Sequence, residues 1–143
     1  MTILDACAVL ALLKDEPAAD QVEELANENG RLTALGVGEV LDHLVRLVGV
    51  TEEEAVLDLA GLGLLLPVPV DATVAIGSGM LRAAHYHRTR RPVSLADCVA
   101  AEAARLSLDA LATADPHLLD LCHDEGIAVH PLPNSKGVTW AAP

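Results

Sequence analysis

The chain has 143 residues, 52% of them hydrophobic, so it is long enough for one domain with a buried core. Only 1% of the residues are aromatic and none is Phe, which excludes a nucleic-acid surface built from stacked aromatic side chains. The formal net charge of −12 gives an average field that repels polyanions, so any nucleic-acid contact needs a local basic region.

Cysteine usage and hydropathy indicate a soluble protein from a reducing compartment. The three cysteines, Cys7, Cys98 and Cys122, are widely spaced and form no C-x-x-C pair, so neither a disulfide framework nor a structural zinc site is indicated. The N-terminus does not have the pattern of a signal peptide. The most apolar run, residues 57–70, is interrupted by an acid and two prolines and is too short to span a bilayer. We expect a cytoplasmic protein with no membrane partner.

Short strands and helices are expected to alternate through the first half of the chain. In order, the pattern predicts a strand at Ile3–Leu4, helices at Ala8–Lys14 and Pro17–Asn29, a strand at Leu32–Leu35 and a helix at Val37–Val48. Gly30 is expected to close the second of these helices. A capping-box pattern, Thr51 with Glu54, then opens a helix to about Leu59. The apolar run Leu64–Val68 is typical of a buried strand.

The same alternation continues in the second half. Asp71 is expected to cap a helix from Ala72 to about His87, and Ser94 with Asp97 repeats the capping pattern at the start of an Ala-rich helix to Leu106. The remaining predicted elements are a strand at Leu108–Thr113, a helix at Pro116–Glu125 closed by Gly126, and a strand at Ile127–His130. Residues 132–143 are expected to form an irregular or disordered tail.

Alternating strands and helices in one domain predict an α/β fold. The expected architecture is a three-layer sandwich with a central parallel sheet of about five short strands flanked by helices. In such sheets the functional site lies beyond the carboxyl ends of the strands. Asp5 and Asp115 both follow predicted strands closely, so we expect them at the same edge of the sheet.

Four acidic residues at or near the ends of predicted elements indicate a metal site: Asp5, Glu39, Asp97 and Asp115. Converging carboxylates are the usual protein ligands of Mg²⁺ and Mn²⁺, and an acidic cluster without such a cation is destabilised by repulsion. Each acid also has an ordinary structural interpretation. Asp97 and Asp115 are typical helix-capping residues, and Glu39 would be unremarkable on the polar edge of a helix. The residues alone leave both interpretations open.

Four segments together resemble the PIN domain, and specifically the VapC-type toxin of type II VapBC toxin–antitoxin pairs. They are LDACAVLALLKDEP, GEVLDHL, RRPVSLADCVAAEAARL and LDALATADPHLLDL, and their order and separations agree with that family over most of the chain. The resemblance implies a PIN-like nuclease domain at residues 1–131, followed by the tail at 132–143.

The resemblance further implies a toxin ribonuclease that hydrolyses RNA phosphodiester bonds with Mg²⁺ or Mn²⁺. Such toxins are neutralised by a cognate VapB-like antitoxin and are usually homodimers. Asp5, Glu39, Asp97 and Asp115 match the family's acidic quartet, and Thr113 matches a hydroxyl position that orders the site. The alternatives are a catalytically weak PIN-like module that binds antitoxin or RNA, and an α/β phosphatase, which would need an acid where Cys7 stands.

A basic cluster precedes the third acidic position. Arg82, Arg88, Arg90 and Arg91 are four of the nine Lys and Arg residues, and they lie within ten positions of one another. A basic rim beside an acidic metal site would bind RNA phosphates. A solvated helix end with cations that favour the helix dipole is equally compatible with the same residues.

Overall fold

The computed structural model describes residues 1–143 and contains one parallel sheet. Its four strands are β1 (Thr2–Leu4), β2 (Gly30–Arg31), β3 (Ala110–Thr113) and β4 (Val129–Pro131). They lie in the order β2-β1-β3-β4, and every neighbouring pair is parallel. Because parallel neighbours require crossover connections, helices separate the strands along the chain. The predicted α/β fold with a central parallel sheet is confirmed.

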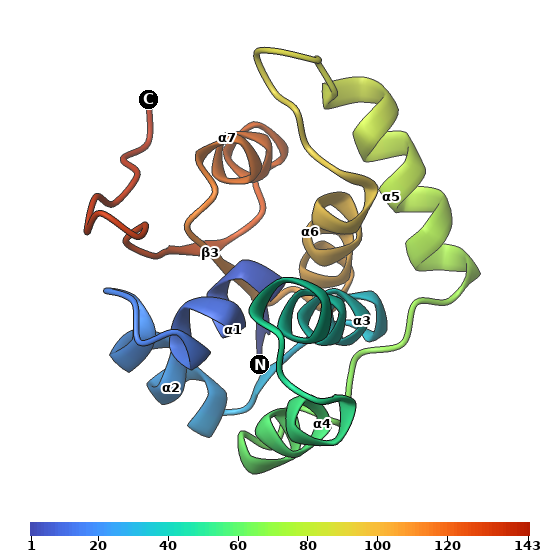
Figure 1. The fold of residues 1–143 in the computed structure, drawn as a ribbon. Helices are drawn as coiled ribbons and strands as arrows, with labels where there is room; N and C mark the ends of the chain where they lie inside the picture. Colours follow the sequence, from blue (N-terminus) through green and yellow to red (C-terminus); the bar gives the residue numbers. More distant parts are fainter.

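Seven α-helices surround this sheet (Figure 1). They are α1 (Ala6–Leu13), α2 (Ala19–Asn27), α3 (Ala34–His43), α4 (Glu52–Gly61), α5 (Ala72–His85), α6 (Leu95–Ser107) and α7 (Pro116–Glu125). A short π-helical segment, η1 (Leu44–Val48), continues α3 and ends at Gly49, whose φ of 89° is readily adopted by glycine. The longest helix has 14 residues, and none combines the length and apolarity needed to cross a lipid bilayer.

The two faces of the sheet carry separate hydrophobic cores, because successive strand residues point to opposite sides. Leu4 and Ala112 belong to the core shared with α1 to α4. Ile3 and Leu111 belong to the core shared with α6 and α7, against which α5 packs through Leu81. Figure 1 shows α1 to α4 gathered on one side and α5 to α7 on the other. The three predicted layers are therefore present.

The predicted strand at Leu32–Leu35 is wrong, because β2 begins two residues earlier at Gly30. Gly30 starts this strand instead of closing α2. A Cβ at that position would lie 2.7 Å from the carbonyl oxygen of Leu25, so the close approach of strand and helix requires glycine. Thr33 already belongs to the next helix, since its hydroxyl accepts a hydrogen bond from Gly36 N–H at 3.0 Å and caps α3.

The strand expected at Leu64–Val68 is absent. Only Val68 makes a strand-like contact, a single parallel bridge to Thr33. The flanking residues Pro67 and Pro69 have no N–H to donate to a strand partner, which explains why the pairing stops there. The sheet therefore has four strands, against about five expected.

The C-terminal segment is irregular but anchored. Leu132 is only 1% exposed, and its N–H donates to the carbonyl oxygen of Thr113 at 2.9 Å. Asn134 closes a turn by accepting hydrogen bonds from two backbone N–H groups. Trp140 Nε1 then donates to Asp120 Oδ1 on α7 at 2.8 Å. We call residues 132–140 the C-terminal strap, because they run from the end of β4 to the surface of α7.

Candidate functional site

Asp5 joins β1 to α1 and is nearly buried, with 5% of its surface exposed. It stands at the N-cap position of α1, yet its carboxylate makes no capping hydrogen bond. Burial, followed by the negative charges of Asp97, Glu39 and Asp115, raises its pKa to about 7 despite an opposing hydrogen bond. A buried carboxylate with no capping role requires another explanation, which the rest of the site supplies.

Thr113, the last residue of β3, links two of the predicted site acids. Its hydroxyl donates to Asp5 Oδ2 at 2.7 Å and accepts from the backbone N–H of Asp115 at 3.1 Å. The parallel pairing of β1 with β3 places the two strand ends side by side, so this bridge follows directly from the sheet register. The threonine thereby fixes the orientation of the Asp5 carboxylate.

Asp97 lies in the first turn of α6 and is half-buried. Its Oδ2 accepts from Ser94 N–H at 2.8 Å, and Ser94 Oγ accepts from Asp97 N–H at 3.0 Å, which completes the predicted capping box. Burial and the nearby charge of Asp115 raise the Asp97 pKa, against the lowering effect of the Ser94 hydrogen bonds. The residue therefore caps its helix and also belongs to a group of mutually repelling acids.

Glu39 and Asp115 complete that group from α3 and α7. Glu39 is exposed at the rim, but surrounding protein atoms partly shield its carboxylate, and this shielding and then the Asp97 charge raise its pKa. Asp115 is the N-cap of α7, and its Oδ1 accepts from His117 N–H at 2.9 Å. None of the protein's ion pairs involves the four carboxylates, which we call the acidic cluster.

The oxygen atoms of the acidic cluster are only partly used by the protein. Asp5, Asp97 and Asp115 each accept a hydrogen bond on one carboxylate oxygen, and Glu39 accepts none. No buried side-chain oxygen in the protein lacks a partner, so the second oxygen of Asp5 must reach solvent. Free carboxylate oxygens with no cationic neighbour, three of them on acids whose pKa is raised (Asp5, Glu39 and Asp97), fit a hard divalent cation.

The acidic cluster is nevertheless not a closed coordination shell. No three Asp, Glu, His or Cys side chains are close enough together to hold one ion between them. The charges of neighbouring acids raise the pKa of Asp5, Glu39 and Asp97. A bound cation would therefore require the carboxylates to move inward, or would contact some of them through water molecules. The assignment of these residues as metal ligands stays a prediction.

Cys7 occupies the first turn of α1, two residues after Asp5, and is exposed. Shielding by surrounding protein and the charges of the acidic cluster, led by Asp5, raise its thiol pKa to about 12. The thiol is therefore protonated at neutral pH and is a poor metal ligand, since metals bind the thiolate. A site based on carboxylate oxygens is the consistent interpretation.

The four predicted RNA-binding arginines lie on α5 and the following loop, and none of them forms an ion pair with the acidic cluster. Arg82 donates to the carbonyl oxygen of Val93 at 3.1 Å and lies over the Tyr86 ring. Arg91 pairs with Asp124 at 2.9 Å. Arg88 and Arg90 are exposed and have no side-chain partner, so they are the two free to meet a phosphate. RNA binding by this group also stays a prediction.

One contribution to the site escaped the sequence interpretation. The C-terminal strap holds the carbonyl of Thr113 through Leu132, although residues 132–143 were expected to be an irregular tail. The signal available in the sequence was a single leucine among prolines, which is too weak to predict a buried contact.

Comparisons with known proteins agree with the fold. A family model described as the PIN domain matches residues 2–124, whereas no curated protein matches the sequence. A chain of FitAcB from Neisseria gonorrhoeae has a TM-score of 0.67 at 20% identity, covering 90% of this chain and 96% of that one. Chains of promoter-bound VapBC2 from Rickettsia felis and of DNA-bound VapBC from Salmonella typhimurium give TM-scores of 0.65 and 0.67 at 16% and 17% identity, with the same coverage. Because the family model spans most of the chain, this protein belongs to the PIN domain family.

Proposed function

We propose that this PIN domain is a metal-dependent endoribonuclease and the toxin of a toxin–antitoxin pair. PIN domains are typically nucleases, and PIN nucleases generally use divalent metal ions. The observation that carries the proposal is the acidic cluster, whose carboxylates come from four different helix starts or helix faces and have no cationic partner. Repelling charges held together by the fold need a positive ligand.

Asp5, Asp97, Asp115 and Glu39 would hold Mg²⁺ or Mn²⁺ through their free oxygens. When bound, such an ion lowers the pKa of a coordinated water and supplies a nucleophile for phosphodiester hydrolysis. The protein's own residues prepare this chemistry. Thr113 orients the Asp5 carboxylate, and Ser94 fixes that of Asp97. The pKa of about 7 leaves Asp5 ready to lose its proton near neutral pH when a cation binds.

RNA is the proposed substrate, and Arg88 and Arg90 would neutralise phosphates on either side of the cleaved bond. Arg82 and Arg91 would support them, since Arg82 is fixed to Val93 and Arg91 ties the loop to α7 through Asp124. Each phosphate neutralised by an arginine would make binding more salt-dependent.

The proposed partners are a VapB-like antitoxin and a second copy of this chain, in the cytoplasm. The fold shared with chains of VapBC and FitAB structures supports an antitoxin partner. Exposed apolar side chains on α5, with Ile76 and Met80 at 64% and 68% exposure, support the homodimer because a second copy would cover them.

Cleavage of RNA by antitoxin-free protein tests the proposal. Total cellular RNA is incubated with the protein and Mn²⁺ or Mg²⁺, with and without EDTA, and the new ends are mapped. We expect discrete fragments that disappear with EDTA. Intact RNA under every metal condition would contradict the nuclease assignment.

The second candidate is a PIN-like module that binds antitoxin or RNA with little catalysis. The absence of any three closely placed metal-binding side chains favours it. Isothermal titration calorimetry with Mn²⁺ separates the two candidates when combined with the cleavage assay. Carboxylate-dependent Mn²⁺ binding without RNA turnover would support the binding module.

A further inference from the structure

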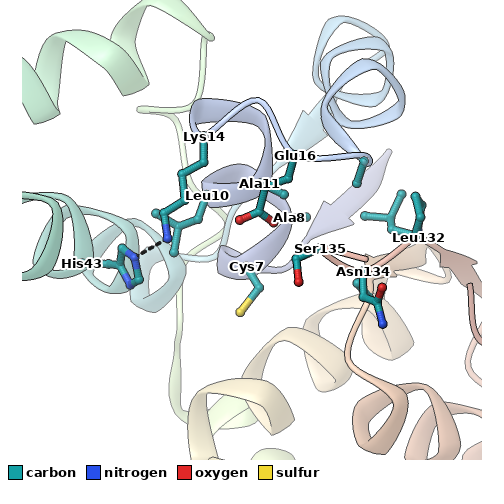
Figure 2. Close-up of a pocket in the computed structure, with 13 residues that line it drawn as sticks. Cys7, Ala8, Leu10, Ala11, Lys14, Glu16, His43, Leu132, Asn134 and Ser135 are labelled. Carbon is teal, nitrogen blue, oxygen red and sulfur yellow. Dashed lines mark hydrogen bonds between the residues drawn. The ribbon is translucent and has the colours of Figure 1, made fainter. Parts of the chain in front are cut away.

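A groove of about 310 Å³ lies between α1 and the C-terminal strap. Cys7 and Ala114, which are close in sequence to Asp5 and Asp115, line one part of the groove, and Lys14 and His43 line another. Figure 2 shows Lys14 and His43 on one side of Cys7, and Asn134 with Ser135 of the strap on the other. This volume is at the lower end of roughly 300–1,000 Å³ for small-molecule pockets, so it suits a ligand of about nucleotide size.

Lys14 gives the groove a positive charge that no carboxylate neutralises. Its Nζ donates to His43 Nε2 at 2.7 Å, the dashed contact in Figure 2, and it takes part in no ion pair. An ammonium group can only donate, so His43 Nε2 is the acceptor in this contact. In a chain with 21 acidic residues, an unpaired lysine in a groove is available for an anionic ligand.

Glu16 gives the same groove a negative charge that is also unpaired. The residue is half-buried and lines the groove, but its carboxylate has no hydrogen bond and no ion pair. It does not pair with Lys14, two residues away along the chain. A ligand that satisfies both groups must present an anion to Lys14 and hydrogen-bond donors to Glu16.

The walls between these charges suit the flat face of a nucleobase. Pro133, which is half-buried, and the edges of Leu10 and Ala11 supply apolar surface, with the buried Leu132 behind them. Asn134 uses Oδ1 to hold the strap turn, which leaves its amide nitrogen free to donate. The C-terminal strap thus forms a polar edge opposite Lys14, and the clasp of Trp140 to Asp120 holds it in place.

We propose that this groove is a nucleotide subsite that prefers guanine. The subsite rests on the proposed ribonuclease function, because it would seat a nucleotide beside the phosphate at the acidic cluster. Guanine presents two adjacent donors, N1–H and the 2-amino group, that match the two oxygens of Glu16. Adenine and cytosine present one amino group beside an acceptor, and uracil has a single N–H between two carbonyls. Lys14 would contact the nucleotide's phosphate.

Nuclear magnetic resonance titration tests this without relying on catalysis. The ¹⁵N-labelled protein is titrated in EDTA with GMP, AMP, CMP and UMP, and the amide signals of the groove are followed. We expect GMP to bind about tenfold more tightly than UMP, within the range for a bidentate contact to a base. Glu16→Gln should remove the preference for GMP, whereas Lys14→Met should lower the affinity for all four nucleotides by a similar factor. Lys136→Met is the matched control, because Lys136 is on the strap but does not line the groove.

The outcomes separate the subsite from the ribonuclease. Groove signals that respond to no nucleotide, or a GMP preference that survives in Glu16→Gln, would overturn the subsite. A basic peptide that shifts these signals where nucleotides do not would also overturn it and identify a protein ligand. Metal-dependent RNA cleavage by a protein whose groove signals respond to no nucleotide would overturn the subsite but leave the ribonuclease function standing. If GMP binding depends on Glu16 but the protein cleaves no RNA, the subsite is supported and the proposed ribonuclease function is contradicted.

Discussion

Helices α4 and α6 begin with the same capping box, but only α6 brings its acid to the candidate site. In α4, Thr51 Oγ1 accepts from Glu54 N–H at 3.1 Å and Glu54 accepts from Thr51 N–H at 3.2 Å. In α6, Ser94 and Asp97 exchange the equivalent bonds at 3.0 and 2.8 Å. As far as local hydrogen bonding goes, the two helix starts are equivalent.

Their surroundings make the difference. Glu54 is exposed and lies outside the acidic cluster, so capping is its whole role. Asp97 is half-buried, and its charge raises the pKa of Asp5 and of Glu39. A capping box therefore does not show whether its acid is functional. The deciding factor is whether the helix starts at the edge of the sheet where other carboxylates lie.

The largest expected effect follows from removing the acidic charge of each capping box in turn. Asp97→Asn should lower metal-dependent RNA cleavage by at least about 100-fold, since even groups that only orient metal ligands contribute about 10–100-fold. Glu54→Gln should leave cleavage unchanged. Initial cleavage rates at saturating Mn²⁺ measure both effects. Equal activity of the two variants would mean that Asp97 is only a cap.

Thr113→Val probes whether orientation of the cluster matters as well as charge. Valine keeps the shape but removes the hydroxyl that donates to Asp5 and accepts from Asp115 N–H. We expect a loss of about 10–100-fold in cleavage and of about 1–3 kcal/mol in the free energy of unfolding, because Asp115 N–H loses its partner. Thr113→Ser restores the hydroxyl and is the control. Full activity in Thr113→Val, measured by cleavage and urea unfolding, would limit Thr113 to packing.

The pH dependence of Mn²⁺ binding should distinguish the buried acid from an ordinary surface carboxylate. Burial first, and then the neighbouring charges, raise the pKa of Asp5 to about 7. A proton therefore competes with the metal below neutral pH, and the Mn²⁺ affinity should fall by about tenfold per pH unit below 7 if one proton is displaced. Calorimetry between pH 5.5 and 8 measures this. A flat profile across that range would show that Asp5 is not a ligand.

The same pKa predicts how stability changes with pH in EDTA. A folded-state pKa above the unfolded value of about 3.8 favours folding while Asp5 is protonated, and this stabilisation is lost as the pH rises through about 7. Asp5→Asn keeps a neutral side chain throughout. The free energy of unfolding of the variant, relative to that of the wild type, should therefore be higher at pH 8 than at pH 4. Urea unfolding at both pH values measures the difference, with Glu54→Gln expected to follow the wild type.

Sequence reasoning reached the fold class because strand and helix patterns are local. It failed where tertiary contacts decide the element. The sequence pattern places Gly30 at a helix end, although its contact with the backbone of Leu25 makes it the start of β2. Leu64–Val68 is a different case, because Pro67 inside it and Pro69 after it cannot donate to a strand partner, and the apolar pattern outweighed this local signal. In both cases the wrong assignment came from pattern alone.

For the candidate site, the chain pattern identified the acids but not what surrounds them. Asp5 and Asp115 follow strands of a parallel sheet, which is enough to place them at one edge. Nothing in the sequence indicated that Lys14 and Glu16 would face a common groove without pairing. Such contacts depend on how α1 packs beside the strap, and that packing has no local signature.

The smallest expected effect comes from removing the two capping hydroxyls. Ser94→Ala and Thr51→Ala should each lower the free energy of unfolding by about 1 kcal/mol, the usual cost of losing an N-cap side chain. Only Ser94→Ala should also reduce cleavage, by a few-fold, because a less rigid start of α6 holds Asp97 less firmly beside Asp5. Because both variants should lose the same amount of stability, a difference between their cleavage rates cannot come from unfolding. If the two variants cleave RNA equally, Asp97 is positioned by the helix itself and the capping box of α6 is as purely structural as that of α4.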